Sequence, residues 1–91
     1  MKIKKEQIEV AVLEEAYKFS QQKGMTAVFP LFLGTKDWGV GKEDIERSVD
    51  SLCRKGWMEK KGVKTVGGQI VPVIRITVGG VDEYRRTHKD S

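Results

Sequence analysis

The junction at Gly56 constrains the fold more than any other feature, because a helical pattern ends there and an extended pattern begins at once. Apolar residues spaced for one helical face predict an amphipathic helix over residues 42–55. These residues are Ile45, Val49 and Leu52. Glycine commonly follows the last turn of a helix, since it adopts the left-handed conformation that other residues resist. Trp57 and Met58 come next, and we expect both to anchor the following strand to the core.

The segment after this junction has the composition of a β-hairpin, with strands predicted over residues 57–66 and 69–78. Gly67-Gly68 lies between them and predicts a two-residue turn. Pro72 has no N–H to donate to a neighbouring strand. We therefore expect its strand to lie at an edge of the sheet or to bulge at the proline.

A last short helix is predicted over residues 78–88, directly after a threonine of the kind that caps helices. Thr77 is the expected cap, and Val81 and Tyr84 are the residues expected to face the core. The chain therefore closes with a helix that follows the hairpin without a linker.

An amphipathic helix is also predicted at the other end of the chain, over residues 4–23, and Gly24 ends it. Its main apolar stripe consists of Ile8, Val12, Ala16 and Phe19. A shoulder beside the stripe consists of Val10, Leu13 and Tyr17. Two interpretations of this shoulder stay open, namely burial within the chain and contact with a second subunit in a homodimer.

Between the two long helices the pattern is less regular. Residues 26–29 predict a short strand, and Pro30 suits the first turn of a short helix that carries Leu31–Leu33 into the core. A glycine-rich loop follows over residues 34–41. Trp38 lies in this loop, and we expect it to fill part of the core rather than to contact a partner.

The length of 91 residues predicts one small domain, residues 1–91, with a single core. Lysines and arginines number 17 against 13 acidic residues, a net charge of +4 that suits nucleic acid or another acidic surface. Cys53 is the only cysteine, so no internal disulfide is expected. The N-terminus lacks the pattern of a signal peptide, and the longest apolar run is about half of a membrane span. We expect a cytoplasmic protein without a membrane partner.

Catalytic and cofactor chemistry is not indicated. The single histidine, His88, lies far from Cys53 in sequence, and no ligand spacing typical of a metal site occurs. The segment GVGKED, residues 39–44, resembles part of a phosphate-binding loop, but Glu43 stands where that loop needs serine or threonine. We expect a non-enzymatic protein that needs no cofactor.

The order of these elements resembles the winged helix-turn-helix superfamily. Two segments carry the resemblance: IERSVDSLCRKGWMEK at residues 45–60 and IRITVGGVDEYRR at residues 74–86. The first is similar to a recognition helix that runs into a wing, and the second to the last strand and closing helix of MarR- and PadR-like regulators. The resemblance covers roughly residues 8–86. It implies an α+β fold with a three-helix core, a β-hairpin wing and a short C-terminal helix. The loop at residues 34–41 departs from the tight turn usual in the family.

For function, the resemblance implies a protein that binds double-stranded DNA, such as a small transcriptional regulator or a phage or plasmid accessory factor. The helix over residues 42–55 would enter the major groove, and the wing over residues 60–69 would touch the backbone. The expected contacts are Lys42, Arg47, Ser51 and Arg54 from the helix, and Lys61, Lys64 and Gln69 from the wing.

The charges of the helix over residues 42–55 leave a second function open. Its four bases and four acids sum to zero, and Glu43–Arg47 and Asp50–Arg54 have the spacing of ion pairs on one helix. A helix that reads DNA usually carries positive charge. A winged-helix module that binds protein and no DNA is therefore the alternative.

Overall fold

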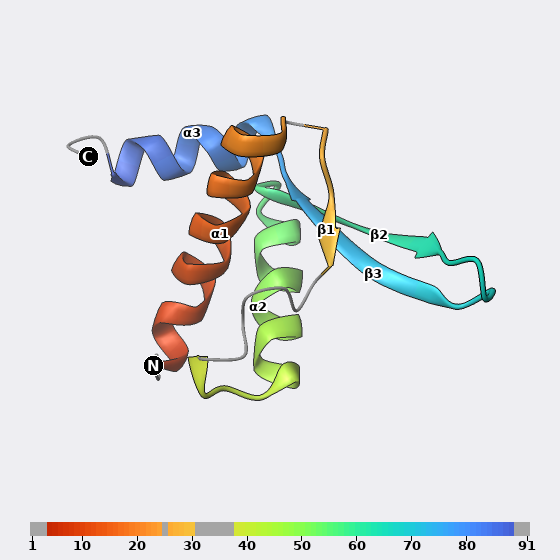
Figure 1. Ribbon diagram of the computed structural model, residues 1–91. Coiled ribbons are helices and arrows are strands. Elements are labelled where there is room, and N and C mark those ends of the chain that lie inside the picture. The colour runs from red at the N-terminus through yellow and green to blue at the C-terminus, as the bar shows by residue number, and fades with distance from the viewer. Residues whose placement is uncertain (1–3, 25, 31–37, 89–91) are drawn as a thin grey trace.

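Figure 1 shows the computed structural model, which describes residues 4–24, 26–30 and 38–88. The elements are a short 3₁₀ helix η1 (Lys5–Gln7), α1 (Ile8–Lys23), β1 (Phe29–Pro30), α2 (Lys42–Arg54), β2 (Met58–Lys64), β3 (Ile70–Ile76) and α3 (Val78–Thr87). The described residues thus form a small α+β domain with three α-helices and a three-stranded antiparallel sheet. The strand order in the sheet is β1–β3–β2. No helix among the described residues has the length and apolar character that crossing a bilayer requires.

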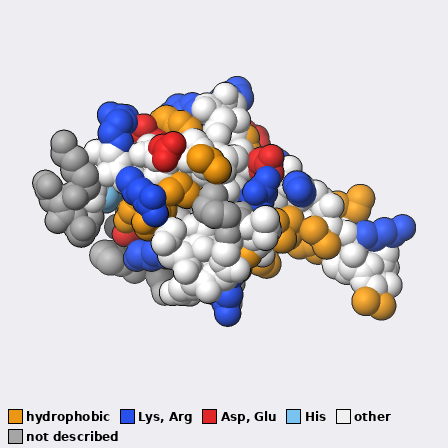
Figure 2. Space-filling view, turned by 90° about the horizontal axis from the view of Figure 1, so that it is seen from above, with side chains coloured by type: hydrophobic (Ala, Val, Ile, Leu, Met, Phe, Trp, Pro, Cys, Tyr) orange, Lys and Arg blue, Asp and Glu red, His pale blue; other side chains and the backbone are white. Residues whose placement is uncertain are grey.

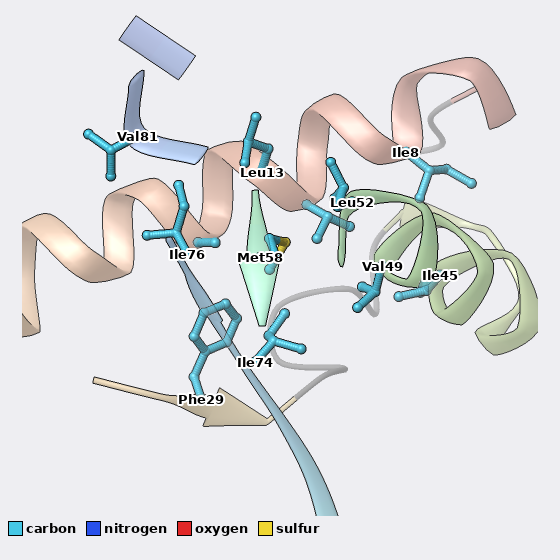
Figure 3. Packing of buried hydrophobic residues seen from close by; sticks show 12 residues of the cluster. Ile8, Leu13, Phe29, Ile45, Val49, Leu52, Met58, Ile74, Ile76 and Val81 are labelled. Atoms are coloured by element: carbon cyan, nitrogen blue, oxygen red, sulfur yellow. The ribbon is translucent and has the colours of Figure 1, made fainter. Parts of the chain in front are cut away.

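The core lies between the sheet and the two long helices. Helices α1 and α2 pack side by side, and α3 crosses the end of α1 beside the base of the hairpin (Figure 1). Figure 3 shows side chains from both long helices, from all three strands and from α3 meeting in one cluster. Its largest fully buried members are Ile8, Ile45, Val49, Leu52, Ile74 and Ile76. Burial of these side chains is the main force that holds the sheet on the helices.

The end of α2 confirms the prediction made for Gly56. This glycine has φ of +82°, and its N–H donates to the carbonyl of Cys53 at 3.0 Å. The N–H of Trp57 then donates to the carbonyl of Leu52, also at 3.0 Å. Met58 is only 2% exposed, so the first residue of β2 is fixed in the core, as predicted.

The hairpin turn differs from the prediction. The N–H of Thr65 donates to the carbonyl of Gln69 at 2.8 Å, so the loop between the strands contains three residues, 66–68, and not two. Gly68 has φ of +84°, whereas Gly67 is not left-handed. Three-residue hairpin loops of this kind place one left-handed residue after a type I turn. Gly68 is this left-handed residue, and Gly67 does not need a left-handed conformation.

The prediction for Pro72 is wrong, because β3 is the central strand of the sheet. Pro72 is opposite Gly62 in β2. The hydrogen bond from the Thr77 N–H to the Trp57 carbonyl shows that odd-numbered residues of β3 form the hydrogen-bonded pairs with β2. The even-numbered Pro72 therefore directs its nitrogen away from β2, and the ladder to β2 loses no hydrogen bond.

The segment before α2 also differs from the prediction. Strand β1 consists of Phe29 and Pro30, which are opposite Ile74 and Val73, so Pro30 lies in a strand and not in the first turn of a helix. The remainder of the short helix predicted at Leu31–Leu33 lies outside the described residues. Phe29 is buried in the core and meets the ring of Phe19 at a centroid distance of 4.7 Å.

The start of α3 confirms Thr77 as its cap. The hydroxyl oxygen of Thr77 accepts from the N–H of Gly80 at 3.1 Å, and the hydroxyl donates to the carbonyl of Gly56 at 2.6 Å. Val81 is buried, as predicted, and Tyr84 is half-buried against the core cluster. One threonine therefore joins the start of α3 to the end of α2.

Gly80 is expected to be the glycine least tolerant of substitution among those in helices. A Cβ at Gly80 would overlap the carbonyl oxygen of Trp57 and lie 2.6 Å from Ile76. We expect Gly80→Ala to lower the free energy of unfolding by about 3 kcal/mol. Gly79→Ala is the matched control, because its Cβ would lie 3.3 Å from the Gly56 carbonyl oxygen and needs only a small shift. Urea unfolding measures the free energy of unfolding of both variants. Similar losses in Gly80→Ala and Gly79→Ala would contradict this prediction.

Candidate nucleic-acid interface

The hairpin extends beyond the core as an arm, which we define as residues 60–70. Every residue of the arm is exposed, and Figures 1 and 2 show the hairpin projecting from the body of the molecule. The molecule measures 44 × 28 × 24 Å. The arm contains Lys60, Lys61 and Lys64 and no acidic residue. It is therefore a narrow, positively charged projection.

The lysines of the arm lie on both faces of the hairpin. Because side chains alternate along a strand, Lys60 and Lys64 share the face of the buried Met58, and Lys61 lies on the other face. At the tip, the N–H of Gln69 donates to the hydroxyl of Thr65 at 3.2 Å, and the Gln69 side chain is exposed. A polyanion that followed either face of the arm would meet an ammonium group.

Two acidic residues near the base of the arm are paired with bases. Asp50 of α2 accepts from Lys60 at 2.9 Å, and Glu59 accepts from Arg75 on the neighbouring strand at 2.7 Å. The hydrogen bond to Asp50 raises the pKa of Lys60, so that lysine keeps its proton. Lys61 and Lys64 form no ion pair with the described residues. Positive charge is thus least compensated toward the outer part of the arm.

The outer face of α2 carries mixed charges, but the two ion pairs predicted there are wrong. Arg47 lies 3.9 Å from Asp44 rather than beside Glu43, and its side chain is 76% exposed. Asp50 turns to Lys60 in the arm and leaves Arg54 without an ion pair among the described residues. The packing of β2 against α2 explains this, because it brings Lys60 alongside the helix.

Two of the residues expected to contact DNA sit at the margins of this face. Lys42 is exposed at the first turn of α2. Ser51 is half-buried and donates to Glu9 of α1 at 3.1 Å, so it turns toward α1 and away from the outer face. Lys55 binds the same carboxylate oxygen of Glu9 at 3.0 Å. Both pairs join α2 to α1 and leave Arg47 and Arg54 as the exposed bases of the outer face.

The shoulder of α1 is used mostly within the chain. Leu13 is 6% exposed, and the ring of Tyr17 stacks on Tyr84 of α3 at a centroid distance of 4.2 Å. For these two residues the structure agrees with burial inside the chain. Val10 is 53% exposed and is the member of the shoulder that stays accessible.

Sequence reasoning missed the role of Lys60. Its pair with Asp50 joins the arm to α2, and Arg75 makes a similar pair with Glu59 across the two strands. The second pair depends on the three-residue loop, which places Glu59 opposite Arg75, whereas the predicted two-residue turn would place Glu59 opposite Ile76. The first depends on how the sheet packs against α2.

Within the described residues no three histidine, cysteine or acidic side chains come together as they would around a metal ion. Comparisons of the chain with protein-family models, with curated proteins and with solved structures give no significant match.

Cys53 is expected to react slowly near neutral pH. Partial burial raises the pKa of its thiol and is the largest effect. Lys60 lowers this pKa by a smaller amount, and Asp50 and Glu59 raise it slightly. Because the thiolate is the nucleophile, alkylation by iodoacetamide at a pH of about 8 should be slower than in the urea-unfolded chain. The rate in the folded chain should also reach half of its plateau at a higher pH. Coincident pH profiles for the folded and unfolded chains would contradict this.

Proposed function

We propose that this protein is a cytoplasmic winged-helix protein that binds DNA. It would act as a small transcriptional regulator or as a phage or plasmid accessory factor. In this proposal α2 enters the major groove and the arm is the wing, which lies along the sugar-phosphate backbone. The contacts are Lys61, Lys64 and Gln69 from the arm and Lys42, Arg47 and Arg54 from α2. Ser51, which is directed toward α1 and bound to Glu9, is not among them.

The observation that carries the proposal is the arm itself. Its residues bury little surface, and its three lysines include two with no ion pair among the described residues. Lysines on an exposed hairpin can also protect its strand edges from pairing with another chain, so the two lysines without an ion pair among the described residues are the ones that favour an anionic partner. Lysines against an evenly spaced polyanion release counterions, which gives an affinity that falls steeply with salt.

The outer face of α2 supports a more limited contribution. Arg47 and Arg54 are exposed and have the length to reach guanine edges, but Glu43, Glu46 and Asp50 share the helix with them. In this proposal the arm supplies the general affinity for DNA. The two arginines supply a preference among sequences, and the neighbouring carboxylates restrict which sequences they accept.

Lys64→Glu is expected to weaken binding to every duplex about ten-fold at low salt. The slope of log affinity against log salt concentration should fall by an amount equivalent to about one to two phosphate contacts. Lys18→Glu on α1 makes the same change in net charge and is the matched control. Fluorescence anisotropy with random duplex DNA at several salt concentrations measures both. Arg47→Ala, tested on duplexes selected from a random pool, should weaken the selected sequence more than the random one.

If Lys64→Glu and the Lys18→Glu control weaken binding equally, only net charge matters and the arm is not the contact. If neither Lys64→Glu nor Arg47→Ala changes binding, both assignments are wrong.

Asp50→Asn is expected to strengthen DNA binding about two- to five-fold at low salt, because it removes the carboxylate that neutralises Lys60 beside the arm. The gain should vanish at high salt. The pair is exposed, so stability should change by less than about 1 kcal/mol. Glu14→Gln, which removes an equally charged partner from Lys18 on α1, is the control. An equal gain in the control would contradict a specific effect at the arm.

The mixed charge on α2 favours one other candidate, a winged-helix module that binds a protein through the same face. The three bases and three acids exposed there match a partner surface of mixed charge better than they match a polyanion. A pull-down that recovers a protein partner, together with no DNA retention at low salt, would support this candidate over DNA binding.

A further inference from the structure

A pocket of about 310 Å³ opens on the side of the molecule formed by α1, α3 and the end of α2. Its volume is at the lower end of the range of pockets that hold small ligands. Its walls come from segments far apart in the sequence, including Val10 of α1, Leu52 of α2, Trp57, and Tyr84 of α3. The DNA-binding proposal does not use this pocket, and the inference drawn from it does not rest on that proposal.

The interior of the pocket is apolar and firmly held. Leu13 and Leu52 line it and are 6% and 1% exposed, so they belong to the core and cannot move aside. Tyr84 is held between the rings of Tyr17 and His88, at centroid distances of 4.2 and 4.1 Å. Val10 lines the pocket and is more than half exposed, so apolar surface is accessible at the opening. Such a site favours a ligand with an apolar or aromatic body.

Acidic residues predominate around this apolar interior. Three glutamates and one lysine line the pocket, which sums to −2 among the described lining residues. Arg86 binds the carboxylate of Glu83 from outside the lining and brings the local sum to −1. Glu9 is paired with Lys55, whereas Glu6 forms no ion pair with the described residues. The pocket is thus negative on a chain whose net charge is +4.

The indole ring of Trp57 already accepts a cation in this structure. The ammonium group of Lys55 lies 5.0 Å from the centre of that ring, within the range of a cation–π contact. Trp57 and Lys55 both line the pocket. Because Lys55 would repel a second cation at this ring, the positive charge of a ligand is favoured near Glu6, which forms no ion pair with the described residues.

Charge also argues against a second copy of this chain as the occupant. A two-fold interface over the pocket would place the same surface on both sides, so two net negative linings would meet. Like charges brought together at an interface oppose association. A small cation is instead attracted to the negative lining of a single pocket.

We propose that the pocket binds a small organic cation with an apolar or aromatic body, such as a protonated arylalkylamine or a quaternary ammonium compound. The body occupies the space over Leu13 and Leu52, and the positive charge lies near Glu6.

The test uses benzyltrimethylammonium as the probe, with benzyl alcohol as a neutral and benzoate as an anionic comparison. Trp38→Phe leaves Trp57 as the only tryptophan, so its fluorescence reports the pocket directly. We expect the cation to change this fluorescence with a saturable curve at millimolar concentration, which is common for a ligand of this size. The neutral compound should bind at least three-fold more weakly, and benzoate should not saturate. NMR shifts of the Val10 and Leu13 methyl groups give the same measurement on the unaltered chain.

Two variants with matched controls test the location. Val10→Phe should fill the opening and abolish binding, whereas Val28→Phe, at another exposed valine, should not. Glu6→Gln should weaken the cation about three-fold or more without affecting benzyl alcohol, and Glu46→Gln on α2 should have no effect. The proposal fails if benzoate binds as well as the cation, or if Val10→Phe retains binding. It also fails if light scattering shows a dimer that Val10→Phe disrupts, since a second copy would then cover the pocket.

Discussion

The arrangement of the molecule depends on the main chain at Gly56 and Trp57, where three elements are joined. The N–H of Trp57 closes α2 on Leu52, and its carbonyl accepts from the N–H of Thr77 at the end of β3. The hydroxyl of Thr77 in turn binds the Gly56 carbonyl at 2.6 Å and caps α3. Short backbone hydrogen bonds of this kind leave little freedom in the angle between a helix and a sheet. The direction of the arm relative to α2 is therefore set within three residues of the helix end.

The same junction separates two surfaces of opposite charge. On one side the strands leave as the arm, which has three lysines and no carboxylate between residues 60 and 70. On the other side the ring of Trp57 lines a pocket with three glutamates and one lysine, and with Arg86 bound to Glu83 the local sum is −1. The arm carries +3, so the net charge of +4 is far from evenly spread over the chain. A concentrated field of this kind matters more for binding a polyanion than the modest total does.

Much of the fold was predictable because it depends on local signals. The apolar spacing of Ile45, Val49 and Leu52, the left-handed Gly56 and the cap at Thr77 each act within a few residues, and all three predictions are confirmed. The α+β class followed from the order of these elements. The three-residue loop was missed because either glycine of a Gly-Gly pair can take the left-handed conformation.

The errors arose where residues distant in sequence decide the outcome. Pro72 was expected at an edge, because a proline cannot donate and the sequence does not show which strand takes the centre of the sheet. The side-chain partners on α2 were misassigned for a similar reason. Spacing on one helix favours Asp50 with Arg54, but the packed sheet offers Lys60 at 2.9 Å, and the interaction of neighbours on a helix is too weak to compete. The pocket needs three segments at once, residues 6–13, 52–57 and 83–88, so no single stretch of sequence indicates it.

The position of Lys60 shows why charge on this surface has to be counted in space and not along the chain. Counted along residues 42–55, the four acids and four bases cancel, and the segment shows no excess of positive charge. In the folded chain Asp50 is directed to Lys60, and Arg54 is left without an acidic partner among the described residues. The same pair removes one positive charge from the base of the arm while it exposes one on α2. Positive charge therefore appears at two separate places, the outer arm and Arg54, which is what a surface needs to contact a backbone and a groove together.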